Sequence, residues 1–168
     1  MIELVTFLVG VLSATVTRTS KPSGGDDLDA VASMLIAETN FNRPKDEMAQ
    51  IVFVAYNRSR KWGIPMSLVV DPAGLRSYRR ASWNLGPKYR ASFNAARSSV
   101  RWEPARDFAR RALMGAYRNQ GHTLFVHPGA LSTAPCGGDR VPVETDYGTR
   151  CLPTWALNGT KVGGAVFA

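Results

Sequence analysis

One carboxylate lies inside an otherwise apolar stretch of the chain: Glu38 in "VASMLIAETNFN", residues 31–42. It follows Leu35 by three residues, so it borders the apolar face of an expected helix, close to where the chain turns. A carboxylate at the wall of an apolar cleft has its charged form desolvated, which raises its pKa. Such a group holds a proton near neutral pH and can act as a general acid. The competing interpretation is a solvent-facing glutamate at a helix end, paired with Arg43 or Lys45.

Other catalytic signatures are missing from the sequence. It contains no Gly-x-Ser-x-Gly elbow, no P-loop and no HExxH motif. A single embedded acid together with many aromatic residues favours carbohydrate cleavage, because the apolar faces of sugars stack on Trp and Tyr rings. Core packing is the alternative role for these aromatics: Tyr78, Trp83, Tyr89, Tyr147 and Trp155. The other acids considered are expected to be exposed: Glu103, Asp107, Glu144 and Asp146.

Two cysteines, Cys136 and Cys151, lie in a region rich in Gly and Pro. A disulfide between them would close a loop of about 15 residues, worth about 3 kcal/mol, and would require an oxidising compartment. Two free thiols are an equal alternative. A zinc site with His122 and His127 is a third interpretation, although the ligand spacing is irregular. We expect no metal and no cofactor.

The local patterns indicate an α+β chain that is mainly α, with a small β element near the C-terminus. Apolar periodicity predicts helices at about 27–39, 44–60 and 104–120. The β-branched and aromatic "HTLFVH", residues 122–127, predicts a short strand. The C-terminal "VGGAVFA", residues 162–168, is expected to pair with its "TLFV" part.

The region 63–103 shows no clean period. "PMSLVVDPAGL" predicts a short helix followed by a turn, and "RSYRRASWNLGPKYR" an irregular segment that lines a surface cleft. Pro104 is expected at the first position of the third helix and Gly121 at its stop.

The N-terminus begins with an apolar stretch, "LVTFLVGVLSATV", residues 4–16. It is shorter than the roughly 20 residues of a membrane span. Its positive charges, Arg18 and Lys21, follow the apolar core instead of preceding it, unlike a signal peptide. A cleaved signal, a membrane-seeking anchor and a contact with a partner in a larger assembly remain open. "SKPSGG", residues 20–25, is expected to be a linker, which divides the chain into 1–25 and 26–168.

The chain is strongly basic, with a net charge of +8 and a pI near 10.0. This balance favours an anionic partner: nucleic acid, an acidic membrane or an anionic cell-wall polymer. A nucleic-acid-binding module is a rival function, because aromatics interleave a basic cluster. The cluster consists of Arg76, Arg79, Arg80, Lys88, Arg90, Arg97, Arg101, Arg106, Arg110, Arg111 and Arg118.

Three stretches, in order, resemble the SleB-type cell wall hydrolases, the spore-cortex-lytic family. In "LDAVASMLIAETNFNRPKDEMAQIVFVAYNR", the family's helix-end glutamate and Asn-Arg pair match Glu38 and Asn57-Arg58. "FARRALMGAYRNQGHTLFVHPGA" and "LPTWALNGTKVGGAVF" resemble its Ala-rich helix and its C-terminal end. The resemblance covers roughly residues 28–168. The chain departs from the family at "AGLRSYRRASW".

The resemblance implies a lysozyme-like, lytic-transglycosylase-like helical domain that cleaves peptidoglycan between N-acetylmuramic acid and N-acetylglucosamine. It implies that Glu38 is the catalytic acid, and that the glycan strand is the partner. The expected substrate-binding residues are Thr39, Asn57, Ser77, Tyr78, Trp83, Tyr147 and Trp155. A location in the cell envelope or a phage particle follows, with residues 1–20 contacting phage-tail or envelope-assembly proteins.

The expected mechanism uses one carboxylate. Glu38 protonates the glycosidic oxygen and then deprotonates the muramic acid 6-hydroxyl, giving a 1,6-anhydro product. The lack of a clear second acid favours this reaction over hydrolysis, which ordinarily needs two carboxylates. In the alternative function, a structural component of a phage particle retains Glu38 as a vestige.

Overall fold

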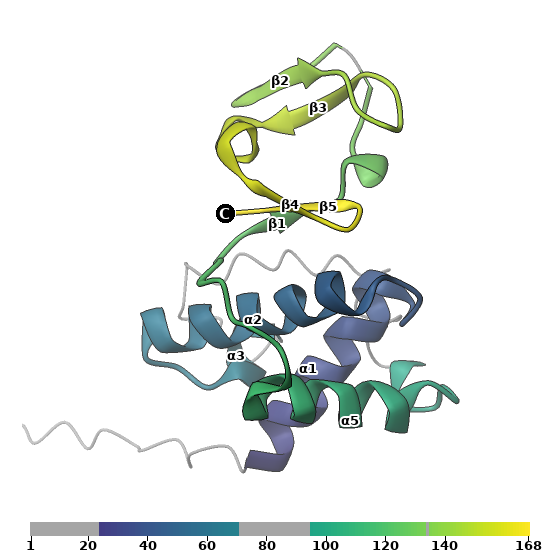
Figure 1. Cartoon of the computed structure of the whole chain (residues 1–168), viewed down its shortest axis with the longest axis vertical. Helices are drawn as coiled ribbons and strands as arrows, with labels where there is room; N and C mark the ends of the chain where they lie inside the picture. The colour runs from purple at the N-terminus through teal and green to yellow at the C-terminus, as the bar shows by residue number, and fades with distance from the viewer. Residues whose placement is uncertain (1–23, 71–94, 134) are drawn as a thin grey trace, which may run out of the picture.

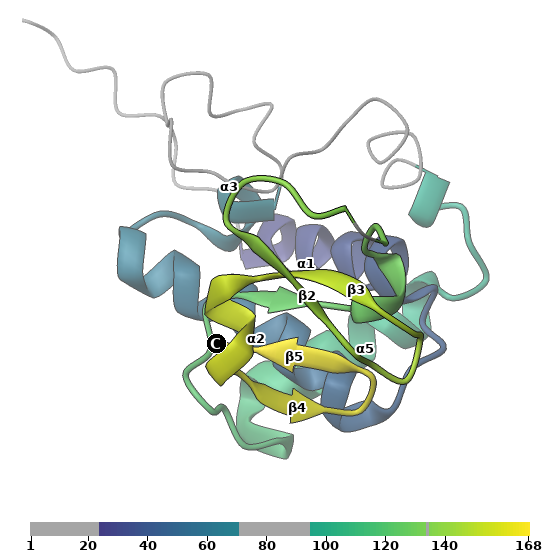
Figure 2. The same ribbon diagram turned by 90° about the horizontal axis from the view of Figure 1, so that it is seen from above.

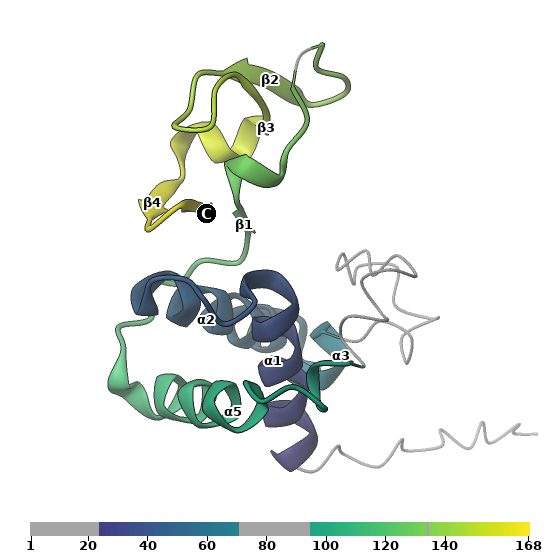
Figure 3. The same cartoon turned by 90° about the vertical axis from the view of Figure 1, so that its right-hand side faces the viewer.

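Helices and strands occupy two separate layers of the molecule (Figure 1). The computed structural model describes residues 24–70, 95–133 and 135–168. The strands lie over α2, as the view from above (Figure 2) and the side view (Figure 3) both show. The predicted α+β class, with the strands towards the C-terminus, is therefore confirmed. The helical layer consists of α1 (Gly24–Thr39), α2 (Lys45–Trp62), α3 (Met66–Val70) and α5 (Trp102–Arg111).

Helix α1 ends at Thr39, as predicted, and begins three residues before the expected Asp27. Its predicted apolar face is buried, with Val31 and Leu35 fully enclosed in the core. The chain turns after Thr39 because Asn40 and Phe41 both adopt left-handed backbone angles, with φ of 51°. α1 also takes the last two residues of the stretch expected to be a linker, whereas residues 1–23 lie outside the described residues.

Helix α2 follows Pro44 and ends at Trp62, and Gly63 caps it with a φ of 65° and an N–H that donates to the carbonyl of Ser59. Asp46 and Glu47 lie in the first turn, where the helix dipole favours negative charge. The short helix expected in "PMSLVV" is α3. The turn predicted after it lies outside the described residues.

Helix α5 begins two residues before the expected start, so Pro104 is its third residue instead of its first. The position is tolerated because the first-turn N–H groups of a helix have no partner inside it. A π-helical turn, Ala112–Ala116, continues α5, and Gly115 within it leaves the helical conformation with a φ of 94°. The predicted extension to residue 120, with Gly121 as its stop, is therefore wrong, because the left-handed backbone of Gly115 ends the helix first.

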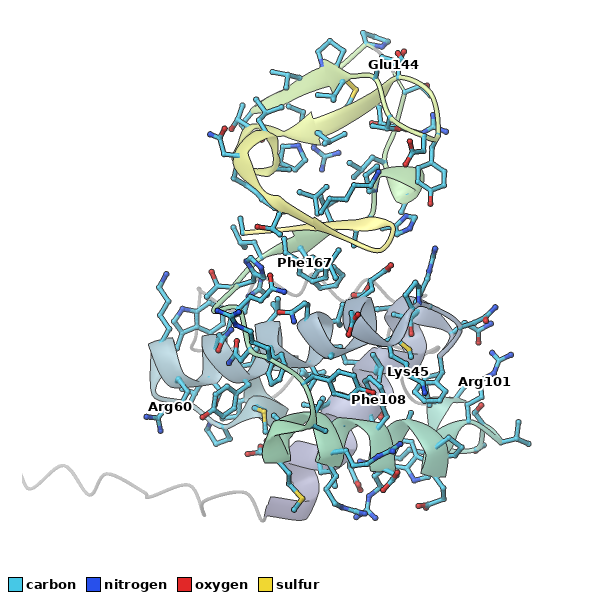
Figure 4. All side chains as sticks on the ribbon, in the orientation of Figure 1. Lys45, Arg60, Arg101, Phe108, Glu144 and Phe167 are labelled. Carbon is cyan, nitrogen blue, oxygen red and sulfur yellow. A yellow bond between two sulfur atoms is a disulfide. The ribbon has the colours of Figure 1, made fainter. Side chains whose placement is uncertain are left out.

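The strands form a three-stranded antiparallel sheet and a separate hairpin. β1 (Phe125–Val126), β5 (Ala165–Phe167) and β4 (Thr160–Val162) lie in that order, and Phe125 pairs with Phe167. The predicted pairing of "TLFV" with the C-terminus is confirmed. Phe167 is fully buried at the boundary between the sheet and the helical layer (Figure 4). β2 (Arg140–Val143) pairs with β3 (Arg150–Pro153) in the hairpin.

A disulfide joins Cys136 to Cys151 and so ties the start of the hairpin region to β3. Because both sulfurs are in this bond, the free-thiol and zinc interpretations are wrong. Among the described residues, no group of His, Cys, Asp and Glu is arranged to hold a metal ion. None of the helices in these same ranges is long and apolar enough to cross a bilayer.

Candidate active site

A cavity of about 540 Å³ lies where the two layers meet. Both layers line it, so residues far apart in the sequence face one space. From the helical layer come Glu38 and Thr39 at the end of α1, Arg43 in the loop, and Glu47, Ile51 and Arg58 on α2. The strand layer contributes Phe125, His127, Tyr147 and Ala165, among others. The volume of the cavity falls within the range of about 300–1,000 Å³ typical of ligand sites.

Glu38 is half-buried in the last turn of α1, on the wall of this cavity. Arg58 is near enough for the charge of Glu38 to act on it. Burial lowers the pKa of Arg58 to about 10, and Glu38 partly opposes this by raising it. Arg58 therefore keeps its positive charge at neutral pH. Its Nε donates a hydrogen bond of 2.6 Å to the carbonyl of Thr123, which fixes the guanidinium between the layers.

Glu47 is a second carboxylate in the cavity, and its side chain is almost completely buried. Its Oε2 accepts a hydrogen bond of 2.8 Å from the N–H of Gly164, in the turn between β4 and β5. In the sequence, Glu47 has only the position of an acid in the first turn of the second helix. A usable signal was its spacing: it precedes Ile51 by four residues, so both lie on one buried face of α2.

His127 and Tyr147 form the opposite wall. The His127 Nε2 lies 3.4 Å from the Tyr147 hydroxyl, and the two ring centroids are 5.2 Å apart. Burial and the charge of Arg43 lower the pKa of His127, whereas the charge of Glu47 raises it. The net direction is downward, so His127 is a neutral imidazole at neutral pH. From the sequence, His127 was expected only as a possible zinc ligand.

Three of the expected site residues occur in this region in different roles. Tyr147 lines the cavity, where its substrate-binding role stays a prediction. Thr39 also lines it, but its hydroxyl donates to the Leu35 carbonyl and accepts from the Phe41 N–H, so it completes the end of α1. Glu38, the predicted acid, shares the cavity with both of them.

Two other expected residues, Asn57 and Trp155, do not join this group. The side chain of Asn57 exchanges hydrogen bonds of 3.0 and 2.8 Å with Asn119 and donates to the carbonyl of His122, outside the cavity lining. Trp155 lies in the 3-10 turn Thr154–Asn158 and is also outside that lining. The remaining candidates lie outside the described residues: Ser77, Tyr78 and Trp83.

The acids considered as alternatives are exposed, as predicted, and none of the four is among the lining residues: Glu103, Asp107, Glu144 and Asp146. Figure 4 shows Glu144 at the end of the strand layer farthest from the helices. Asp146 instead pairs with Lys161 at 2.7 Å on the surface.

No model of a known protein family, no characterised protein and no solved structure matches this chain. The case for a function therefore comes from the chemistry of the cavity and from the quoted motifs.

Proposed function

We propose that the protein cleaves the glycan strand of peptidoglycan between N-acetylmuramic acid and N-acetylglucosamine, with Glu38 as the general acid. One observation carries the proposal: Glu38 is half-buried on the wall of a cavity that also holds a second carboxylate and a tyrosine. A catalytic glutamate at a helix end is also what the resemblance to SleB-type hydrolases implies. We infer a lysozyme-like, lytic-transglycosylase-like arrangement on the same grounds.

The first chemical step uses groups of the described chain. Glu38 donates its proton to the glycosidic oxygen while the bond to the sugar carbon C1 breaks. Glu38 is then negatively charged, and the fixed cation of Arg58 beside it stabilises that charge. The transition state resembles an oxocarbenium ion, which the neighbouring carboxylates favour. Tyr147 offers an aromatic ring to the sugar on the opposite wall.

The step after bond cleavage has two forms. In a lytic transglycosylase the muramic acid 6-hydroxyl attacks C1, and in a hydrolase water does. The sequence-based prediction of the first form depended on the lack of a second acid. Because Glu47 lies in the same cavity, that argument no longer favours the transglycosylase.

Charge and the disulfide support a location in the cell envelope or on a phage particle. Peptidoglycan and its attached polymers are anionic, so a net charge of +8 increases the rate of encounter. The Cys136–Cys151 bond suits an oxidising compartment outside the cytoplasm. The proposed contact of residues 1–20 with assembly proteins concerns a segment outside the described residues.

Product analysis with purified peptidoglycan tests the proposal. The wild type should produce clearing in a zymogram and release muropeptides detectable by mass spectrometry. Glu38→Gln should reduce the rate by about 10²–10⁴-fold, because the amide cannot donate the proton. Glu103→Gln is the matched control, since Glu103 is an exposed acid on α5 outside the cavity lining, and it should keep wild-type activity. Wild-type cleavage by Glu38→Gln would refute the assignment, and DNA binding without glycan cleavage would favour the nucleic-acid-binding rival.

A further inference from the structure

We propose that Glu47 is the second catalytic carboxylate and that it makes the reaction a hydrolysis. The inference rests on the proposed glycan cleavage and specifies its second half. In this reaction Glu47 activates a water molecule, and the product carries a reducing-end sugar instead of a 1,6-anhydro ring.

The Glu47 carboxylate is buried at a cost in free energy. Glu47 is only 2% exposed, and its neighbours on the same helix, Met48 and Ile51, are buried apolar residues. A buried charge is expensive unless it is paired or hydrogen-bonded, and such groups cluster at functional sites. Here the carboxylate lines the cavity that contains the proposed acid, so it is placed to meet substrate.

The turn between β4 and β5 is shaped to hold the Glu47 carboxylate. Gly163 and Gly164 connect β4 to β5 and approach the site through their backbone. A Cβ at Gly163 would collide with the carboxylate of Glu47, and a Cβ at Gly164 would come within 2.8 Å of His127 Nε2. Two successive glycines therefore let the main chain reach Glu47, where the Gly164 N–H fixes one carboxylate oxygen.

The contacts of the Glu47 carboxylate fix its orientation, and a neutral His127 lies near it. Fixing Oε2 by a backbone donor restricts the carboxylate before substrate arrives, which is the preorganisation that a catalytic group requires. His127 stands close enough for the charge of Glu47 to act on it, and it remains neutral at neutral pH. The N–H of Gly164 therefore holds the Glu47 carboxylate without an ion pair from His127.

The resulting step is balanced in atoms and charge. Glu38 gives its proton to the glycosidic oxygen as the C1–oxygen bond breaks, and the leaving sugar departs with a hydroxyl group. The carboxylate of Glu47 takes a proton from water as the water oxygen bonds to C1. One water is consumed and a C1 hydroxyl forms. Glu38 is then ionised and Glu47 protonated, and proton exchange with solvent restores both groups.

A structural role for Glu47 makes a different prediction, which Glu47→Gln separates. The amide oxygen of Gln can still accept the hydrogen bond from Gly164, so the turn keeps its anchor, but the amide cannot accept a proton from water. If Glu47 only holds the turn, Glu47→Gln should keep its activity. If Glu47 is the base, activity should fall by about 10²-fold or more, while the thermal unfolding midpoint stays near the wild-type value.

Isotope labelling and azide rescue complete the test. Wild-type digestion in H₂¹⁸O should add one ¹⁸O to each new reducing end. Glu47→Ala should be inactive in buffer and should regain activity with sodium azide, forming a glycosyl azide at C1, because the small anion replaces the activated water. A 1,6-anhydro product without ¹⁸O, or wild-type activity in Glu47→Gln, would overturn the proposal.

The two proposals fail in distinguishable ways. If Glu38→Gln is inactive while Glu47→Gln cleaves normally to anhydro products, only the role of Glu47 is lost. If the wild type cleaves no glycan at all, the proposed function itself fails. The labelling result does not depend on any variant folding correctly.

Discussion

The two histidines of the chain make its stability depend on pH in a defined direction. Burial lowers the pKa of His122, and burial with Arg43 lowers that of His127, although Glu47 opposes the second shift. Between the lowered folded pKa and the ordinary value of about 6.5, the unfolded chain binds more protons than the folded one. The free energy of unfolding contributed by these groups therefore rises with pH through this window and falls on acidification below about 6.5.

Urea unfolding at pH 7 and pH 5 measures this effect. The wild type should lose stability at pH 5, and the double variant His122→Asn, His127→Asn should lose less. The ion pair of Asp146 with Lys161 does not affect this comparison between pH 7 and pH 5. Because Lys161 lowers the pKa of Asp146, the contribution of the pair to stability is lost only below about pH 4. An equal loss in the wild type and the double variant would contradict the prediction.

At the scale of single residues, the sequence places Glu38 at the end of a helix beside its apolar face, but it does not show which residues surround it. Glu38 was recognisable because the acid interrupts an apolar helical face at a turn. Glu47 was harder to find, because acids in the first turn of a helix are usually explained by the helix dipole. Its burial depends on Gly164, which is 117 residues away, and no local pattern reports such a contact.

At the scale of elements, the turn between β4 and β5 should tolerate no side chain at Gly163. Gly163→Ala should destabilise the protein and reduce any glycan cleavage, because the new Cβ would displace the carboxylate of Glu47. Gly63→Ala is the matched control: Gly63 has a similar φ, 65° against 60°, but nothing lies within 4 Å of its added Cβ. Both variants carry the cost of placing a Cβ on a left-handed backbone, about 1–2 kcal/mol.

The difference between these two variants isolates the contact with Glu47. Thermal unfolding and the zymogram should show a larger loss for Gly163→Ala than for Gly63→Ala. Equal losses would mean that backbone strain alone accounts for the effect and that the turn does not position Glu47.

Elements were predictable where their signals are local. The end of α1, the short α3 and the pairing of β1 with β5 follow from apolar periodicity and from β-branched, aromatic composition. The predicted end of α5 was wrong because Gly115 adopts a φ of 94°. A glycine inside a helical pattern does not show from the sequence whether its φ is positive. The cavity was not predictable, since it forms only when the strand layer covers α2.

At the scale of the whole molecule, the disulfide should stabilise the wall of the cavity that faces the helices. Cys136 and Cys151 are 15 residues apart, and the loop they close contains β2 and Tyr147. In the chain-entropy description, closing a loop of this length lowers the free energy of folding by about 3 kcal/mol. Reductant should therefore lower the free energy of unfolding by a similar amount. It should also weaken glycan binding, because Tyr147 then depends on the hairpin alone.

Urea unfolding with and without dithiothreitol measures the stability term, and the KM for soluble glycan strands measures the second effect. The double variant Cys136→Ala, Cys151→Ala is the control, since it should already have the lower stability and should not respond to dithiothreitol. Cys151 is fully buried, and alanine leaves no polar group unsatisfied there. A wild type that unfolds at the same urea concentration in both conditions would show that this bond does not stabilise the fold. A loss of stability with unchanged KM would show instead that the hairpin holds Tyr147 in place without the disulfide.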